Sequence, residues 1–186
     1  WNDTFGGGTS TITGTWGTAY YILFEMHERL VFGTGNAVIE YTDVQQPWDR
    51  ANGGFRLLKG NIVGAIAFVP EGGSELNTVA LFSTTAGPMF LSGFDLTDST
   101  KPVHGANVAL NHQCLVATDK WIMYMTREGG IEAINIYGKK DLGRRLFVGD
   151  GVSGPTDTFQ ATNTNHPTLP FGYYNQKKKQ AMWFYP

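Results

Sequence analysis

Residues of the types that catalyse reactions or bind metals are spread through this sequence of 186 residues, and they do not form a recognisable motif. The four histidines lie far apart, and none has a second His, Cys or carboxylate at the spacing of metal ligands. They are His27, His104, His112 and His166. The Asp residues do not form a calcium-binding loop. The sequence therefore predicts no metal and no cofactor, and histidines that are structural or solvent-facing.

Carboxylates are the second group that could do chemistry, because glycoside hydrolysis needs a pair of them. The candidates are Glu25, Glu28, Glu40, Glu132, Asp95, Asp98 and Asp119. Nothing in their spacing selects a pair. The nucleophile motif Gly-x-Ser-x-Gly is absent, and Gly33-Thr34-Gly35 leads into a strand-like segment instead of a nucleotide-binding helix. We therefore predict no catalytic residues and a protein that is not an enzyme.

Aromatic residues in polar loops are the remaining candidates for contact with another molecule. Trp48 and Asp49 lie in the loop 45–52, Trp16 lies in a segment rich in Gly and Thr, and His166 lies in a long polar stretch. A tryptophan in a loop can stack on a ligand or a partner, although anchoring the loop is its commoner role. We name these four residues as candidate partner contacts.

The composition excludes several classes of protein. Charged residues make up 16% of the sequence and 24 residues are glycine, which excludes a coiled coil, a helical bundle and a charged disordered tail. The net charge is −2 and there is no basic stripe, so nucleic-acid binding is not indicated. No apolar stretch approaches the about 18 residues that indicate a membrane helix. The single cysteine, Cys114, cannot form an internal disulfide and is predicted to be a buried hydrophobe.

One arrangement of short apolar runs recurs along the chain at intervals of 43 to 60 residues. The runs are anchored at Leu30, Val79, Ile122 and Met182. In the first three units a strand-like segment precedes the anchor, and a glycine-containing turn and two more strand-like segments follow it. Four antiparallel strands in about 40–50 residues are typical of a β-propeller blade. We predict an all-β fold of antiparallel four-stranded meanders arranged as propeller blades, with a generic meander or sandwich as the alternative.

The predicted blades cover residues 20–60, 62–110 and 113–149, with an incomplete blade at 171–186. Residues 1–18 are predicted to be a linker or a strand of a preceding blade, and residues 150–170 a long inter-blade loop that contacts partners. The apolar run at 181–185 would leave an unpaired strand edge, so we expect a fragment of a larger propeller. A strand at 9–16 that folds back onto this edge is the alternative.

Within the units, the fourth strands are predicted at 55–58, 103–110 and 144–148, and the third strand of the third unit at 131–137. Residues 25–29 could form one turn of helix, but aromatic and β-branched residues flank them and favour strand. The predicted packing residues are Leu30, Phe32, Ile66, Phe68, Leu81, Phe82, Phe90, Ile122, Tyr124, Ile134 and Trp183.

A resemblance to a known family lies in the first unit. It is carried by Phe24-Glu25-Met26-His27-Glu28-Arg29-Leu30-Val31-Phe32-Gly33, by Val38-Ile39-Glu40-Tyr41-Thr42-Asp43 and by Pro47-Trp48-Asp49. These residues resemble a blade of phage tail tubular (nozzle) proteins. The resemblance covers about 25 residues, while the other units share only the apolar pattern. It implies a β-propeller within a larger, multi-copy protein at the distal end of a tail, without catalysis.

The expected function is therefore that of a structural, non-enzymatic component of a bacteriophage tail, either a nozzle (tubular) or a head–tail connecting protein. It would be located in the virion and contact copies of itself and neighbouring virion proteins. The alternative is a secreted or surface β-propeller that binds carbohydrate or processes glycosides. Converging carboxylates in a central pocket would favour the alternative.

Overall fold

The computed structural model describes residues 2–5, 8–11, 22–33, 36–44, 53–74, 77–92, 100–128, 130–142 and 170–184. Over these residues the chain is all-β, as predicted, and every strand pairing is antiparallel. The same residues contain no α-helix, and the 3-10 helix η2 spans His112–Cys114.

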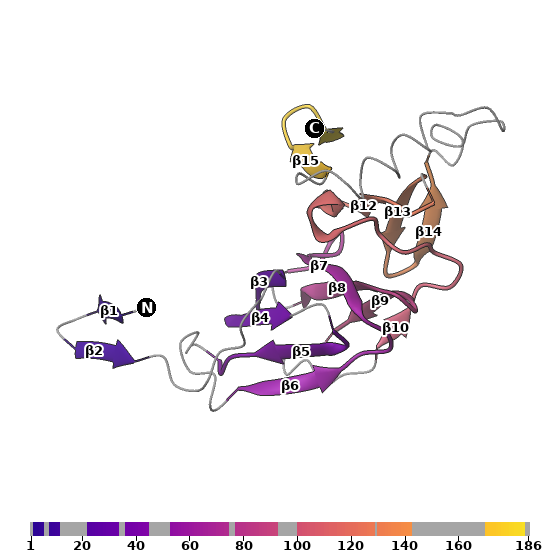
Figure 1. Cartoon of the computed structure of the whole chain (residues 1–186). Coiled ribbons are helices and arrows are strands. Elements are labelled where there is room, and N and C mark those ends of the chain that lie inside the picture. The colour runs from indigo at the N-terminus through magenta and orange to yellow at the C-terminus, as the bar shows by residue number, and fades with distance from the viewer. Residues whose placement is uncertain are drawn as a thin grey trace.

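The strands form three four-stranded meanders and two hairpins (Figure 1). The first meander consists of β3 (Ile22–Met26), β4 (Arg29–Gly33), β5 (Val38–Tyr41) and β6 (Gly54–Leu57). The second consists of β7 (Ile62–Phe68), β8 (Val79–Thr84), β9 (Gly87–Leu91) and β10 (Lys101–Pro102). The third consists of β11 (Val116–Ala117), β12 (Ile122–Met125), β13 (Ile131–Asn135) and β14 (Gly138–Asp141). The N-terminal hairpin pairs β1 (Asn2–Phe5) with β2 (Gly8–Thr11), and the C-terminal hairpin pairs β15 (Phe171–Asn175) with β16 (Gln180–Phe184).

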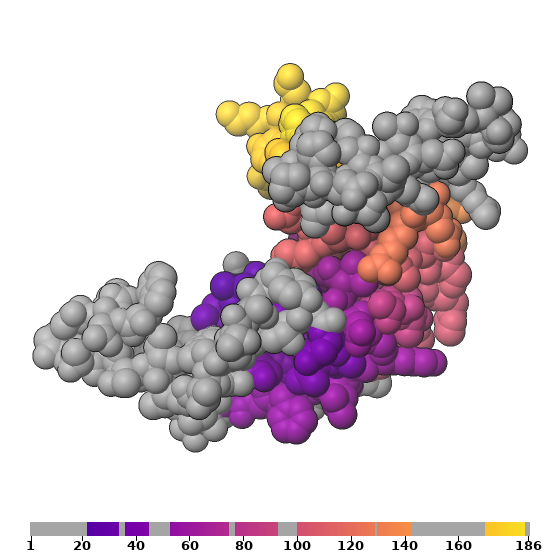
Figure 2. Space-filling view, viewed as in Figure 1, coloured from indigo at the N-terminus to yellow at the C-terminus, as the bar shows by residue number. Residues whose placement is uncertain are grey.

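The two central strands of the second meander, β8 and β9, are buried on both faces, which explains why they are apolar at almost every position. Along β8, Ala80 and Phe82 pack against the first meander, while Val79 and Leu81 pack against the third. All six residues of β8 are buried. The three meanders and the C-terminal hairpin therefore stack face to face, with the first meander at one end and the hairpin at the other (Figures 1 and 2).

The first strands of the meanders lie next to one another. β3 contacts β7, β7 contacts β11, and β11 contacts β15. The closest approach is at Gly172 in β15, where a Cβ atom would lie 2.2 Å from Val116 Cγ2 and 2.9 Å from Trp183 Nε1. Only a residue without a side chain permits this spacing, so Gly172 sets how closely the hairpin packs on the third meander.

Most of the predicted core is confirmed. Cys114 is fully buried, and of the predicted packing residues only Leu30, Ile66 and Trp183 are half-buried rather than buried. The run of three lysines before β16 forms an exposed hairpin turn at 176–179.

Two predicted strands of the second and third units were placed wrongly. The segment 103–110 is not the fourth strand of the second meander, because β10 occupies only Lys101–Pro102. Residues 108–110 instead cross to the third meander, where Ala109 pairs with Thr126 and the Leu110 N–H donates to Met125 O. The strand-like segment expected before Ile122, at 114–117, begins in η2, because the Asn111 side chain accepts the Cys114 N–H and caps a helical turn, and β11 spans only Val116–Ala117.

The strand predicted at 131–137 ends at Asn135. The Asn135 side chain accepts the N–H groups of Tyr137 and Gly138, and Gly138 has φ 153°. This turn reverses the chain at once, so β14 is the fourth strand of the third meander. The strand predicted at 144–148 lies outside the described residues. At the N-terminus, residues 9–11 of the strand predicted at 9–16 belong to β2, which pairs with β1, and residues 12–16 lie outside the described residues.

Residues 25–29 form no helical turn. β3 and β4 are joined by His27 and Glu28, which have φ values of 54° and 60°. Positive φ at both central residues defines a type I′ hairpin turn, whose twist matches that of the flanking strands. The Glu28 N–H donates to Glu25 Oε1, and His27 Nε2 lies 3.2 Å from Thr78 O in the second meander.

We expect the substitution Glu28→Gly to stabilise the protein by about 1 kcal/mol, because glycine adopts positive φ without the steric cost that a Cβ atom imposes. His27 is retained, so the contact with Thr78 is kept. The measurement is the midpoint of urea unfolding. Glu128→Gly, in a turn where φ is not positive, is the matched control and should give no gain. Equal stabilisation by both substitutions would contradict the turn assignment.

Candidate functional site

A hollow of about 360 Å³ lies beside β13 and β14, under the loop that connects the second and third meanders. Its lining residues are Gly105, Asn107, Thr126, Glu128, Gly130, Ile131, Glu132, Lys139 and Asp141. The lining mixes charged and polar side chains with Ile131 and contains no aromatic ring, so the hollow offers no surface for stacking a sugar or a base.

Glu132 is the centre of this site. It lies on β13 of the third meander, where it pairs with Tyr124 of β12 on one side and with Asp141 of β14 on the other. Only 3% of Glu132 is exposed. A buried carboxylate is costly unless it is paired and hydrogen-bonded, so its partners decide what it can do.

Four donors converge on the Glu132 carboxylate. Oε2 accepts the Asn107 backbone N–H at 2.8 Å and lies 3.1 Å from the Tyr124 hydroxyl. Oε1 accepts the Asn107 side-chain amide at 2.9 Å and pairs with Lys139 Nζ at 3.4 Å. The Tyr124 hydroxyl is also 3.1 Å from Asn107 O, so its single proton is shared between two acceptors. Lys139 Nζ lies 3.3 Å from Asp141 Oδ1 as well.

This arrangement engages all the acceptor positions of a carboxylate, which number about four. The carboxylate of Asp141, which lies opposite Glu132 on β14, contacts the same Lys139 ammonium group. The site therefore acts as a structural cross-link. It joins the connecting loop at Asn107 to β12, β13 and β14 through one buried charge.

Burial, together with the negative charge of Glu132, raises the pKa of Tyr124 above its ordinary value. The folded state thus keeps a proton that an unfolded tyrosine loses near pH 10. A raised pKa in the folded state means that the stabilisation is complete below pH 10 and is lost as the pH rises further.

We expect the free energy of unfolding to fall above pH 10 by up to about 1.4 kcal/mol per pH unit from this group. In the Tyr124→Phe variant, the part of this pH dependence that comes from Tyr124 should disappear, even though the substitution itself lowers the free energy of unfolding. The measurement is urea unfolding between pH 9 and 11.5, with Tyr137→Phe as the control because Tyr137 is 85% exposed. Equal slopes for the protein and the Tyr124→Phe variant would show that this hydroxyl titrates normally.

None of the residues named from the sequence as partner contacts can be placed. Trp16, Trp48, Asp49 and His166 lie outside the described residues. Two of the carboxylate candidates, Asp95 and Asp98, lie outside them too.

The other described carboxylate candidates do not meet at one site: Glu25 and Glu28 share the first turn of the first meander, Glu40 lies on β5, and Asp119 lies in the turn before β12. Glu25 accepts the Glu28 N–H at the first turn, and Asp119 pairs with Lys179 and with the Tyr174 hydroxyl on the C-terminal hairpin. Glu132 alone among them lines the hollow. Sequence reasoning did not identify Asn107, Tyr124 and Lys139 as its partners. The available signal was a glutamate inside the apolar strand Ile131-Glu132-Ala133-Ile134, since such a residue requires a buried partner.

The histidines occupy separate positions. His112 Nδ1 lies 3.3 Å from the Ala65 N–H, and burial lowers the pKa of His112. His104 is exposed in a turn. Over the part of the chain that the structure describes, no three His, Cys, Asp or Glu side chains lie close enough to hold a metal ion.

Cys114 is the last residue of η2, which contacts β15 of the C-terminal hairpin. Its Sγ is 3.1 Å from Asn111 O, and burial raises the pKa of the thiol. A protonated, buried thiol is a poor nucleophile, so Cys114 serves packing. The Trp183 indole donates to Cys114 O at 2.9 Å and so attaches β16 to the third meander.

Comparison with known proteins finds no protein-family model and no curated protein that matches this chain. Among the described residues, no helix combines the length and the apolar character needed to cross a bilayer.

Proposed function

We propose that the chain is part of a β-propeller that serves as a structural, non-enzymatic component of a bacteriophage tail, as a nozzle (tubular) or head–tail connecting protein in the virion. The observation that carries the proposal is the succession of contacts between first strands, from β3 to β7, β11 and β15. In a propeller, four-stranded meanders surround a central channel, so the first strands of neighbouring blades lie side by side.

The packing of the meanders supports the same architecture. Each face of the second meander is covered by a different neighbour, and the connections between meanders run forward along the chain without a crossover. A sandwich would instead bury one face of each of two sheets.

Several of the described residues that carry the family resemblance have scaffold roles. The Arg29 guanidinium lies 5.4 Å from the centre of the Tyr41 ring. Leu30 and Thr42 exchange hydrogen bonds, in which the Leu30 N–H donates to Thr42 Oγ1 and the Thr42 N–H donates to Leu30 O. His27 links the first meander to the second through Thr78. A motif that fixes one meander and joins it to the next suits a rigid particle component.

The cross-linked state of Glu132 favours a structural role over glycoside processing. Hydrolysis needs one carboxyl group that exchanges protons and a second that faces the substrate. Here the candidate carboxylate is held by Asn107, Tyr124 and Lys139.

The proposal is tested in the phage whose genome encodes the chain. An epitope tag on the protein should co-purify with tails through a density gradient at a constant copy number, and gold-labelled antibody should mark the tail. Electron cryo-microscopy of these tails should show the meanders arranged radially around an axis. Tails that assemble normally after deletion of the coding sequence would overturn the structural role. Oligosaccharide binding that Trp48→Ala abolishes would support the carbohydrate-binding alternative.

A further inference from the structure

A lysine, an asparagine and a buried glutamate meet at the hollow beside β13 and β14. Glu132 Oε1 lies 2.9 Å from the side-chain nitrogen of Asn107 and 3.4 Å from Lys139 Nζ. One carboxylate oxygen therefore contacts both an amine and the amide nitrogen that an attacking amine would displace. An amine, a carboxamide and a group that moves protons between them are the components needed to join two side chains by an amide bond.

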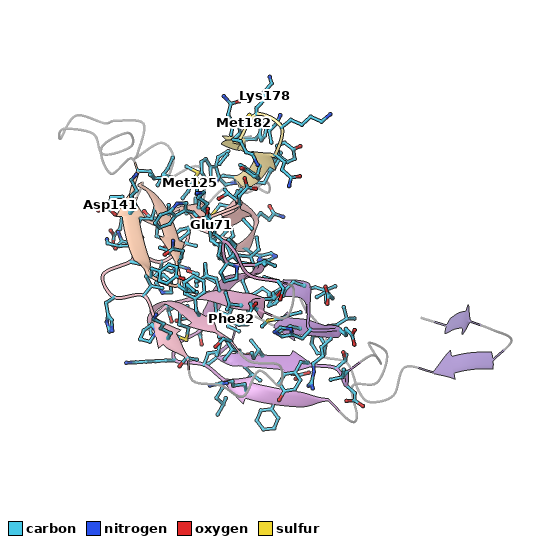
Figure 3. The ribbon with its side chains drawn as sticks, turned by 180° about the vertical axis from the view of Figure 1, so that it is seen from behind. Glu71, Phe82, Met125, Asp141, Lys178 and Met182 are labelled. Carbon is cyan, nitrogen blue, oxygen red and sulfur yellow. The ribbon has the colours of Figure 1, made fainter. Side chains whose placement is uncertain are left out.

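The fold brings these groups together from separate elements. Glu132 on β13 pairs with Asp141 on β14, which Figure 3 labels. Lys139 is two residues from Asp141 along the same strand, so both lie on the face of the sheet that carries Glu132. The loop between the second and third meanders crosses this face. At Gly105 of that loop, a Cβ atom would lie 3.8 Å from Lys139 Cε, so the loop runs against the lysine side chain.

Asn107 is held on both sides of its side chain. Its backbone N–H donates to Glu132 Oε2 at 2.8 Å, and its carbonyl oxygen lies 3.1 Å from the Tyr124 hydroxyl. These bonds fix the backbone of Asn107 and direct its amide at Glu132 Oε1. A reaction between groups held in this way is unimolecular, and well-oriented groups reach effective concentrations of about 10⁵ M or more.

We propose that Lys139 and Asn107 become joined by an isopeptide bond after the chain has folded, with Glu132 as the proton carrier. Glu132 takes a proton from the Lys139 ammonium group, and the neutral amine attacks Cγ of Asn107. A bond forms between Lys139 Nζ and this carbon. The noncovalent network described above is the state before the reaction.

The second half of the reaction releases ammonia. Glu132 delivers its proton to Nδ2 of Asn107 and takes the second proton from Lys139 Nζ, and the bond between Cγ and Nδ2 breaks. Ammonia removes this second proton as ammonium, so Glu132 ends the reaction ionised, as it began. Nothing is oxidised or reduced, and no further reactant is needed. The hollow of about 360 Å³ that these residues line gives the ammonia a way out.

The other contact of the lysine defines the competing products. Asp141 Oδ1 lies 3.3 Å from Lys139 Nζ. A bond from Lys139 to Asp141 or to Glu132 would release water instead of ammonia. An ionised carboxylate resists attack by an amine because its negative charge weakens the electrophilic character of its carbon. The neutral amide of Asn107 is therefore the expected acceptor.

The bond would attach the connecting loop to β14 covalently. The reaction takes place once in each chain, so it agrees with a protein that is not an enzyme. It does not depend on the role in a phage tail proposed above, because the bond is detected in the purified chain. A chain that carries the bond but does not enter tails would refute the proposed function and not this inference.

The test is the mass of the intact chain, purified and kept folded at neutral pH. We expect a mass about 17 Da below that of the sequence, which is the mass of one ammonia molecule. Trypsin should then release a branched peptide. In it, segment 60–120, which contains Asn107, is joined to segment 128–140, which contains Lys139.

Three variants each remove one of the groups. Lys139→Arg keeps the positive charge but not the nucleophilic amine, Asn107→Ala removes the acceptor, and Glu132→Gln removes the proton carrier. Each should have the full mass of its sequence. Lys140→Arg, at the neighbouring exposed lysine, is the matched control and should still lose ammonia. Circular dichroism establishes that every variant is folded.

Four results would overturn the proposal. A folded, unaltered chain with the full mass of its sequence would show that the bond does not form. A loss of about 18 Da, the mass of water, would assign the bond to Asp141 or Glu132. A loss of ammonia that persists in Lys139→Arg would come from a cyclic imide at Asn107. A loss that persists in Glu132→Gln would show that this carboxylate does not carry the proton.

Discussion

Phe82→Ala should lower the free energy of unfolding by about 3–5 kcal/mol, because the substitution removes a large side chain from the interface between two meanders and leaves a cavity. Phe82 is fully buried, and its ring centre lies 5.9 Å from that of Phe24 in the first meander (Figure 3). The measurement is the midpoint of urea unfolding followed by circular dichroism.

Phe55→Ala is the matched control, since it removes the same side chain from a position that is 68% exposed. Its effect should stay within about 0.5 kcal/mol. Leu81→Ala tests the other face of the same strand and should cost about 2–5 kcal/mol. If Phe82→Ala lowered the free energy of unfolding by less than Phe55→Ala does, Phe82 would not hold the two meanders together.

Glu132→Ala should also cost about 3–5 kcal/mol, for an electrostatic reason. Removing one partner of a buried, hydrogen-bonded charge pair leaves the other groups without an acceptor. Here the Asn107 backbone and side-chain N–H groups lose their acceptor, while the Tyr124 hydroxyl keeps Asn107 O and Lys139 keeps Asp141. Glu132→Gln keeps one carbonyl oxygen and should cost less, about 1–3 kcal/mol.

Asp141→Asn is the control for Glu132, because Asp141 shares the Lys139 contact but is exposed. Its effect should stay below about 1 kcal/mol. The order expected is therefore Glu132→Ala, then Glu132→Gln, then Asp141→Asn. If Glu132→Gln were neutral while the protein lost a measurable activity, Glu132 would have a chemical role and not a structural one.

Much of the fold could be predicted from the sequence because the signals are local. The apolar runs around Val79 and Ile122 indicated strands, since neighbouring side chains point to opposite faces and a run without polar residues must be covered on both. The structure confirms this at β8, where every residue is buried. Cys114 was predicted to be buried for the same kind of reason, because it lies in an apolar run.

The ends of the strands were predicted less accurately than the strands themselves, because single hydrogen bonds determine where a strand ends. Asn135 stops β13 two residues early by accepting the N–H groups of Tyr137 and Gly138. Asn111 turns the chain into η2 by accepting the Cys114 N–H. In the sequence, both asparagines are simply polar residues next to a strand. Which N–H groups their side chains accept is determined only by the folded backbone.

The sequence by itself determined the all-β class, the succession of meanders and most of the core, because composition and alternation act over a few neighbouring residues. Tertiary structure decided the rest. The partners of Glu132 come from positions 107, 124 and 139, and only the register of β12, β13 and β14 brings them to one carboxylate. Likewise, Phe55 and Phe82 are both phenylalanines in apolar strands, yet one is exposed and the other buried. The stacking order of the sheets makes that difference, and it depends on contacts between residues far apart in the chain.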